Sequence, residues 1–449
     1  MASTYIRKTF STTGTSRQKF TLSMWIKRGS GLGAEQMLCE CYSGSSAKDE
    51  IWLQSNDTIN FVKTDGGGLA TTTSAVFRDT CSWYHLVISA DSTQGSNANR
   101  IKIYINGVQQ TLGQQDTIPQ NANFQFGASG ANLTFGRRNA GDWYFNGSMT
   151  HVHMIDGTAY DASAFGETDT TTGEWKAKTS PSVTYGTNGF LILKDGNTIT
   201  DQSSNSNAFT LGGGTLTDLK DNPDNVFATI NPLDNYYANS VFANGNNSIT
   251  TNNNARTFNN TTLGMTSGKY YCEMKSAGVA AGAMVGIIAT SPNSATNRAD
   301  NNPYAWQYIN GGTMKNNGST QSGTWASWGS GDIIGIALDL DNNKIWFSKN
   351  GVWQNTGSAN PSTGTDGFTI TAVSALPGDQ AGCYFFNCQD NSTSTELSYF
   401  NWNFGNGYFG TTAITTNSGN GYSGAEGSSK FNYTVPTGYS ALSTKGLNE

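Results

Sequence analysis

Short runs in which apolar and polar residues alternate dominate the sequence, and clusters of Gly, Asn, Asp, Ser and Thr separate these runs. A period of two residues is the repeat of a β-strand, whereas a helix repeats about every 3.6 residues. Residues 101–106 (IKIYIN) place three isoleucines on one side, and Asn106-Gly107 then supplies the turn of a tight hairpin. Because charged residues make up only 13% of the chain, long amphipathic helices are not expected. The pattern predicts an all-β protein with antiparallel sheets.

The 449 residues are enough for two or three domains at about 150 residues per domain. With 36% hydrophobic and 12% aromatic residues, the chain can bury real cores, which argues against disorder. The strand-like pattern ends near residue 166, where a polar, Thr-rich stretch begins, and an Asn-rich stretch begins at residue 225. We therefore predict two tandem antiparallel β-sandwiches: a first sandwich over 1–165, a polar linker with room for an extra strand over 166–224, a second sandwich over 225–405, and a Gly-rich tail with room for an edge strand over 406–449.

Charge and apolar length exclude two classes of partner. The net charge is −6, and Arg137-Arg138 is the only Arg-rich spot, so we expect no nucleic acid partner. The longest apolar runs are much shorter than the roughly 20 residues of a membrane helix, so we expect no membrane insertion. No secretory signal opens the sequence, and its six Cys form no framework, so we expect free thiols in a chain that folds in a cytoplasm.

Residues that carry chemistry are few. His151 and His153 lie two apart in a probable strand and have Asp156 nearby, which is compatible with a metal site but also with ordinary strand histidines. The run Asp339, Asp341, Asn343 begins like a calcium loop, but Lys344 stands where that loop needs Gly, and a hairpin turn explains it better. The sequence shows no paired catalytic acids, no nucleophile-elbow motif and no phosphate-binding loop motif. We assign no catalytic residue, no metal ligand and no cofactor.

Aromatic side chains in segments predicted to be loops are the candidate binding residues. Flat rings stack on sugars and anchor protein partners, and large aromatics are also common in cores. The alternative is that most of these rings, about two-thirds, cap the sandwich cores. The predicted contacts are Trp143, Tyr144, Tyr304, Trp306, Tyr308, Trp325 and Trp328.

The first half resembles the laminin-G-like, concanavalin A-like jelly roll. The resemblance covers most of residues 1–165 and rests on four segments in the expected order. HVHMID (151–156) stands where that family carries an acidic Asp-Glu pair, so we do not carry over its calcium site. The four segments are FTLSMWIKR (20–28), WYHLVISAD (83–91), RIKIYINGVQ (100–109) and the closing text from GDWYFNG to DASAF (141–165).

The second half resembles an SPRY domain. SGKYYCEMK (267–275) looks like its Gly-x-Tyr-Tyr-x-Glu strand, and residues 331–353 (GDIIGIALDLDNNKIWFSKNGVW) match its central hairpin almost throughout. NWNFG (401–405) looks like its Asn-Phe-Gly end. Families of this kind bind through loops at one end of the sandwich, which is why the aromatics between 304 and 328 are the predicted contacts.

Two further segments, DNPDNVFATINPL (221–233) and the ending from Tyr433 on, resemble virion proteins of tailed bacteriophages. The resemblance implies a non-enzymatic tail-fibre or head-fibre adhesin, located in the virion, that binds host-surface polysaccharide or protein and other virion proteins. Trimeric assembly is the expectation for that class. Two alternatives stay open: a capsid decoration or tail-assembly protein that binds only virion subunits, and a polysaccharide depolymerase.

Overall fold

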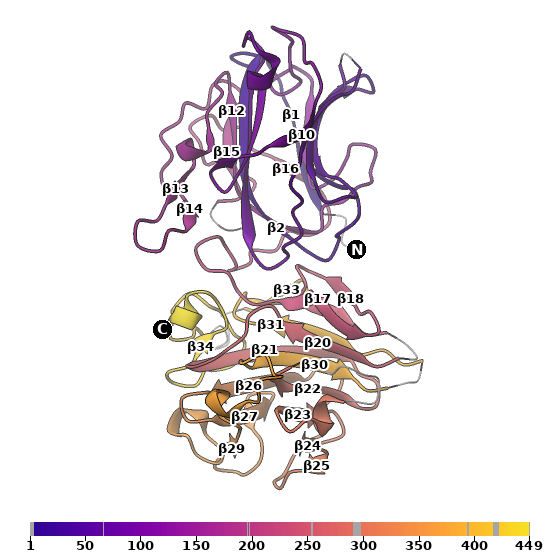
Figure 1. Cartoon of the computed structure of the whole chain (residues 1–449), viewed down its shortest axis with the longest axis vertical. Coiled ribbons are helices and arrows are strands. Elements are labelled where there is room, and N and C mark those ends of the chain that lie inside the picture. Colours follow the sequence, from indigo (N-terminus) through magenta and orange to yellow (C-terminus); the bar gives the residue numbers. More distant parts are fainter. Residues whose placement is uncertain are drawn as a thin grey trace. The chain divides into compact units, whose positions relative to one another are not determined.

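A computed structural model describes residues 4–65, 67–194, 196, 198–252, 255–290, 298–392, 395–415 and 422–448. The chain divides into two units, Met1–Asp218 (the first unit) and Leu219–Glu449 (the second unit). In the described residues every regular element is a β-strand or a 3₁₀ turn of three residues (Figure 1). This confirms the predicted all-β fold.

The first unit packs an eight-stranded sheet against a six-stranded sheet. The larger sheet has the order β10-β6-β5-β4-β3-β11-β1-β16, and the smaller one has the order β15-β12-β2-β7-β8-β9. The strands of the larger sheet are β1 (Tyr5–Thr9), β3 (Gln36–Gly44), β4 (Ala47–Leu53), β5 (Ile59–Lys63), β6 (Leu69–Thr73), β10 (Leu112–Gln115), β11 (Asn132–Phe135) and β16 (Thr210–Gly213). Those of the smaller sheet are β2 (Lys19–Arg28), β7 (Trp83–Asp91), β8 (Ile101–Ile105), β9 (Val108–Gln109), β12 (Gly147–Asp156) and β15 (Phe190–Ile192).

Alternation along β8 shows how the sequence builds this core. Ile101, Ile103 and Ile105 are buried against the opposite sheet, whereas the residues between them are half-buried. Asn106 and Gly107 have φ values of 47° and 81°, the left-handed pair that a two-residue hairpin between β8 and β9 requires. The predicted hairpin is confirmed.

Residues 166–218 also contribute strands to the first unit. β15 pairs with β12 and β16 pairs with β1, so this stretch extends both sheets. β13 (Gly166–Thr168) and β14 (Trp175–Ala177) form a separate small hairpin beside the sandwich. The apolar residues of β15 are all buried, whereas those of the more polar, Gly-containing β16 are exposed or half-buried at the edge of its sheet.

The second unit packs a seven-stranded sheet, β17-β20-β30-β22-β23-β24-β25, against a nine-stranded sheet. The smaller sheet contains β17 (Ile230–Tyr237), β20 (Thr257–Thr261), β22 (Ala283–Ile288), β23 (Ala305–Ile309), β24 (Thr313–Asn316), β25 (Ser319–Thr320) and β30 (Phe385–Asp390). The larger sheet contains β18 (Val241–Ala243), β19 (Ser248–Thr250), β21 (Lys269–Gly278), β26 (Ile333–Asp339), β27 (Lys344–Lys349), β28 (Val352–Trp353), β29 (Phe368–Thr369), β31 (Tyr399–Asn403) and β34 (Ser440–Ala441). β32 (Tyr408–Phe409) and β33 (Thr412–Ala413) form a separate hairpin. The predicted turn at residues 341–343 joins β26 to β27 and is confirmed.

The end of the chain, residues 422–448 (the closing segment), covers the outer face of the nine-stranded sheet. Phe431 and Tyr439 pack there on Tyr271 of β21 and Trp346 of β27, and this makes a second apolar cluster outside the main core. β34 adds a parallel pairing to β21. The closing segment also bonds to the start of the unit, since Phe227 bridges to Ser443.

In the described ranges no helix is long and apolar enough to cross a membrane. All six cysteines are free, as predicted, and four of them are fully buried: Cys39, Cys41, Cys272 and Cys388.

Candidate functional site

Two carboxylates face each other on the outer side of the eight-stranded sheet. Glu40 on β3 and Glu50 on β4 are direct cross-strand partners. Cys39, Cys41 and Ile51 on the same strands point into the core, so the alternation of the strands turns both glutamates away from it. The sequence indicated no paired acids, whereas the structure brings Glu40 and Glu50 together across two strands.

Lys48 joins the two glutamates. Its Nζ lies 2.8 Å from Oε1 of Glu50 and 3.8 Å from Oε1 of Glu40. Burial raises the pKa of Glu40 to about 7, and the neighbouring Glu50 charge adds to the rise, while the Asn139 N–H and Lys48 oppose it. Glu40 therefore exchanges its proton near neutral pH beside a lysine-paired carboxylate, an arrangement that is able to donate and accept a proton.

A loop over residues 136–146 (the cover loop) closes over this pair. The Asn139 N–H donates to Glu40, and the ring of Trp143 lies 5.8 Å from that of Trp52 on β4. The guanidinium of Arg138 lies 4.1 Å from the Trp143 ring centroid. Glu40 keeps only 2% of its exposure, so the carboxylate is covered. The predicted contacts Trp143 and Tyr144 are half-buried parts of this cover.

The predicted contacts of the second unit gather in one place, but three of them are core side chains. Tyr308 is fully buried, and Trp328 and Trp306 keep 3% and 8% exposure. Tyr308 lies 5.2 Å from Trp325 and 6.3 Å from Trp328, measured between ring centroids. Trp306 and Tyr308 are two apart on β23, so both face the opposite sheet. The structure places these three rings in the core rather than on a binding surface.

Tyr304 and Trp325 remain half-buried at the rim of that core. The indole of Trp325 donates to the Ser322 carbonyl at 3.2 Å, and its ring lies 5.6 Å from Phe368. Among the five predicted contacts in this unit, only these two keep part of their surface for a ligand.

His85 and Ser23 form a buried pair that does not have the polarity of a catalytic dyad. The indole N–H of Trp175 donates to Nδ1 of His85 at 2.9 Å, and Nε2 lies 2.8 Å from the Ser23 hydroxyl. Burial lowers the pKa of His85 to about 3, so the ring is neutral. Because an indole only donates, Nδ1 accepts and Nε2 carries the proton, which it donates to Ser23. His85 is therefore unable to deprotonate Ser23, which is itself fully buried.

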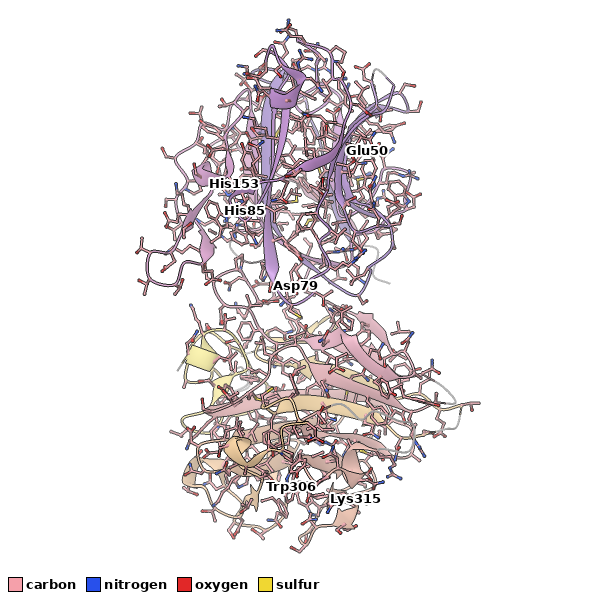
Figure 2. The ribbon with its side chains drawn as sticks, in the orientation of Figure 1. Glu50, Asp79, His85, His153, Trp306 and Lys315 are labelled. Carbon is pink, nitrogen blue, oxygen red and sulfur yellow. The ribbon has the colours of Figure 1, made fainter. Side chains whose placement is uncertain are left out.

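The residues that were compatible with a metal site have other partners. Burial lowers the pKa of His153 to about 3, and its Nδ1 lies 2.9 Å from the Tyr185 hydroxyl. A β-bulge between Thr150 and His153 breaks the alternation that would align His151 with it. Asp156 accepts from the backbone N–H groups of Thr15, Ser16 and Asn188. Within the described residues no group of three or more His, Cys, Asp or Glu side chains is placed to hold a metal ion. Figure 2 shows where His85, His153 and Glu50 lie in the first unit.

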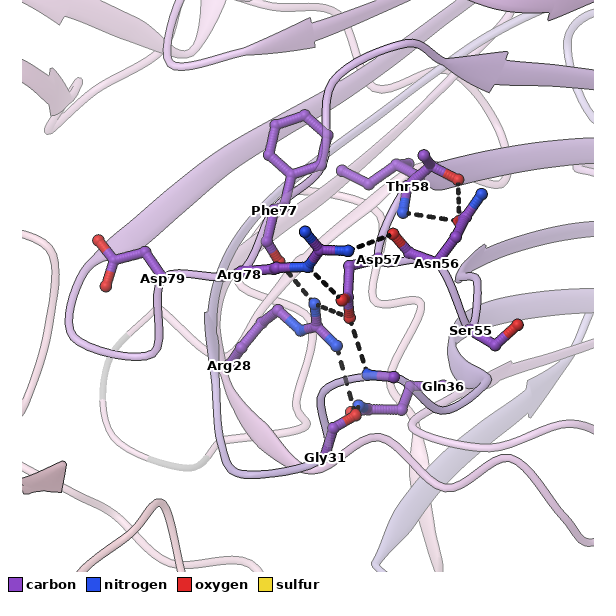
Figure 3. A network of polar contacts seen from close by, with 12 residues as sticks. Arg28, Gly31, Gln36, Ser55, Asn56, Asp57, Thr58, Phe77, Arg78 and Asp79 are labelled. Atoms are coloured by element: carbon purple, nitrogen blue, oxygen red, sulfur yellow. Dashed lines mark hydrogen bonds and ion pairs between the residues drawn. The ribbon is translucent and has the colours of Figure 1, made fainter. Parts of the chain in front are cut away.

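A buried ion pair in the first unit has a structural role. Nη1 of Arg28 lies 2.9 Å from Oδ1 of Asp57, and Nε of Arg78 lies 2.7 Å from Oδ2 (Figure 3). Arg28 also donates to the carbonyls of Phe77 and Gly31. The side chain of Arg28 is fully buried, so these bonds tie three loops together and leave its guanidinium inaccessible to a ligand.

Two sequence families match the chain. Residues 2–163 match the laminin-G type of the concanavalin A-like lectin/glucanases superfamily, and residues 269–385 match the SPRY domain. The chain joins a concanavalin A-like domain to an SPRY domain. No curated protein matches the sequence.

Solved structures resemble each part separately. The SPRY domain of human HERC1 is 17% identical, with 38% of this chain and 96% of that chain covered and a TM-score of 0.29. The PSpry domain of TRIM65 is 11% identical, with 39% and 91% covered and a TM-score of 0.28. A heptameric SAP-like pentraxin from Limulus polyphemus is 13% identical, with 35% and 72% covered and a TM-score of 0.27. At these values the likenesses carry no argument about function.

Sequence reasoning missed Glu40 and Glu50 in the concanavalin A-like domain. Gly44 pairs with Ala47 around a turn at Ser45 and Ser46, and a regular hairpin centred there would place Glu40 opposite Ile51. A register shift between Tyr42 and Gly44 brings the two glutamates opposite each other instead, and the local pattern of residues does not contain that shift.

Proposed function

We propose that this protein is a non-enzymatic bacteriophage virion protein, a tail-fibre or head-fibre adhesin that binds glycan or protein on the surface of a host cell. The observation that carries the proposal is the tandem of a concanavalin A-like domain and an SPRY domain, because both resemble recognition modules. A fold alone does not assign a function, so the argument also depends on the sites.

The reactive side chains support a binding role over a catalytic one. His85 donates to Ser23 instead of accepting from it, and Glu40 is covered by backbone. Nucleophilic catalysis needs a base that accepts the proton of the hydroxyl. Adhesion needs no such group, because many weak contacts multiplied by copy number supply the affinity.

The two segments that resemble phage virion proteins form one element. The Val226 N–H donates to the Thr444 hydroxyl at 3.0 Å, and the Thr444 N–H donates to the Val226 carbonyl at 2.9 Å. The Ala228 N–H donates to the Leu442 carbonyl at 2.9 Å. Each of the two segments resembles virion-protein sequence, and in the structure they pair with each other within the second unit. This supports a shared origin with those virion proteins. In that setting the partners are other virion proteins, and a homotrimer is the expected assembly.

Adsorption of the fluorescently labelled full chain to a panel of bacterial cells tests the proposal. Saturable binding to at least one strain is expected. Cells oxidised with periodate, which cleaves sugar diols, and cells treated with proteinase then separate glycan from protein receptors. Absence of saturable binding, together with antibody labelling over the capsid lattice, would transfer the assignment to a decoration protein.

The pairing of Glu40 with Glu50 favours a second candidate, a polysaccharide depolymerase, in which the cover loop would have to expose these two buried carboxyl groups to the substrate. The Oε1 atoms of Glu50 and Glu40 lie 2.8 Å and 3.8 Å from the same Lys48 Nζ, so the two carboxyl groups are near each other, as the acid and the nucleophile of a retaining glycosidase are. The reaction uses a carboxylic acid that keeps its proton and a second carboxyl group beside it, and the raised pKa of Glu40 suits it to the role of the acid.

Release of reducing ends from capsular polysaccharide tests this candidate. Activity that Glu40→Gln and Glu50→Gln abolish, and that Glu167→Gln on the exposed strand β13 leaves intact, would establish it. Equal release by all four proteins would point to a contaminant and remove the candidate.

A further inference from the structure

Exposed apolar side chains of the second unit concentrate in one short stretch. Among the described residues ten large apolar side chains are exposed, and four of them fall within residues 233–241. Single exposed apolar side chains are normal on protein surfaces, but a contiguous group marks an interaction site. The group, which we call the aromatic edge, consists of Leu233 (64% exposed), Tyr236 (38%), Tyr237 (53%) and Val241 (68%).

The fold gives the aromatic edge a firm base. β17 is the outermost strand of the seven-stranded sheet, and β18, the next strand along the chain, is the outermost strand of the nine-stranded sheet (Figure 1). The Tyr236 ring lies 6.5 Å from the ring of buried Phe258, at 28° to its plane. It lies 6.1 Å from the Tyr237 ring and is tilted by 59° to it, so the two rings present adjacent faces at an angle. A buried neighbour fixes Tyr236, so little conformational freedom is lost when a ligand binds.

An added β-strand is a poor occupant of this edge. Pro232 lies within β17 and has no N–H to donate to a neighbouring strand. The register of β17 shifts between Ile230 and Asn235, and β18 is only three residues long. Proline, irregular register and short length are the devices by which sheet edges avoid pairing with another chain. Recognition at this edge therefore uses side chains, which also argues against a second copy joined through its strands.

The stretch of chain that carries the two tyrosines is polar and rich in asparagine. Asn239 is exposed two residues after Tyr237, and its carbonyl accepts from the Asn252 amide. Asp234 and Arg256 are the nearest charges along the chain, and their signs are opposite. A stable protein interface needs roughly 800 Å² on each partner with a central apolar core, and four side chains set among asparagines do not provide one. Exposed aromatic rings in a neutral, amide-rich stretch of chain fit a ligand that has apolar faces and many hydroxyl groups.

We propose that Tyr236 and Tyr237 form a stacking platform for a neutral saccharide chain. This inference rests on the proposed adhesive function and assigns the glycan contact to the edge of the SPRY domain. The rings take the C–H faces of sugar units, and the asparagine amides take their hydroxyls.

Depletion of the full chain by insoluble neutral polysaccharides, namely cellulose, chitin and cross-linked dextran, tests the inference. Saturable binding to at least one of them is expected, with Kd raised about tenfold in Tyr237→Ala and retained in Tyr237→Phe, which keeps the ring. Tyr422→Ala is the matched control, because Tyr422 is similarly exposed (37%) but lies in the closing segment. Binding to none of the three polysaccharides, or equal binding by Tyr237→Ala, would overturn the inference.

Cell adsorption with the same variants separates this inference from the proposed function. Saturable adsorption to cells that is indifferent to Tyr236→Ala and Tyr237→Ala would leave the adhesin in place and remove the platform. Polysaccharide binding that depends on Tyr237, in a chain that adsorbs to no cells, would keep the platform and remove the adhesin.

Discussion

Each unit covers the outer face of one of its sheets, and the two covers differ in chemistry. In the first unit the cover loop closes over Glu40 and Glu50, so polar groups meet across the covered face. In the second unit the closing segment lays Phe431 and Tyr439 on Tyr271, so apolar groups meet. The first cover combines bonds to the glutamates with the packing of Trp143 on Trp52, whereas buried apolar area dominates the second.

The cover of the second unit stabilises the fold by apolar burial, whereas the cover of the first unit shields ionisable carboxyl groups. Apolar burial stabilises in proportion to area and leaves no chemistry behind. Polar burial is costly for carboxylates, and the cost appears as the raised pKa of Glu40. The apolar cover of the second unit also encloses one carboxylate. Glu273 accepts there from the N–H groups of Asn432 and Tyr433, each at 2.8 Å.

Phe431→Ala should have the largest effect, because it removes a fully buried ring from the closing segment. We expect a loss of about 3–5 kcal/mol in the free energy of unfolding of the second unit, with the first unit unchanged. Pulse labelling of thiols with methyl methanethiosulfonate in increasing urea measures each unit separately. Mass spectrometry then identifies the labelled thiols: Cys272 and Cys388 report the second unit, and Cys39 and Cys41 report the first.

The matched control is Tyr422→Ala, whose side chain is 37% exposed in the same segment. We expect this control to change the urea midpoint little. Equal midpoints for Phe431→Ala and Tyr422→Ala would show that the closing segment does not hold the second unit together by apolar burial.

Glu273 makes the stability of the second unit depend on pH. Burial raises the pKa of Glu273 from 4.5 to about 7. Between these values the folded state binds more protons than the unfolded state, so stability falls as pH rises. We expect the second unit to lose about 1–3 kcal/mol from pH 4.5 to 7. The Glu273→Gln variant should give a flat profile when Cys272 labelling is followed over this range, and an equally steep profile in the variant would refute the assignment.

Local chemistry explains which parts of the fold the sequence predicted. The turns at Asn106-Gly107 and at residues 341–343 follow from residues that favour a left-handed backbone and lie between strongly alternating runs. Strand pairs joined by such turns are adjacent in sequence, so no long-range information is needed.

Burial of the aromatics depends on contacts that local patterns do not contain. Alternation places Trp306 and Tyr308 on one face of β23, but which face meets the opposite sheet is decided by the whole fold. The pairing of residue 226 with residue 444 is likewise set by contacts far apart in sequence. The bulge before His153 is a third example, because one extra residue cancels the alternation that predicted a shared face.

Trp175→Phe separates the directional bonds of the first unit from its apolar burial. The variant keeps an aromatic ring beside His85 but removes the N–H that donates to Nδ1. We expect a loss of about 1 kcal/mol in the first unit, and a mixture of imidazole tautomers in place of the Nε2–H form. Nitrogen NMR of labelled histidine reads the tautomer. A wild-type ring protonated on Nδ1 would contradict the assigned polarity.

The smallest effect is expected for the pH dependence of the first unit, where two pairs of groups oppose each other. Burial raises the pKa values of Glu40 and Asp49 to about 7 and lowers those of His85 and His153 to about 3. Between about pH 4.5 and 6.5 the folded state holds two extra carboxyl protons, while the unfolded state holds two extra histidine protons. The two slopes cancel. The free energy of unfolding of the first unit, followed by the labelling of Cys39 and Cys41, should therefore change by less than about 1 kcal/mol over this range, in contrast to that of the second unit. Below pH 4.5 the histidine contribution remains and the carboxylates whose pKa is lowered, among them Asp57, Asp91 and Asp169, add to it, so the stability of the first unit should fall toward pH 3. A first unit that loses stability as steeply as the second between pH 4.5 and 6.5 would mean that the two histidines are not held neutral by burial.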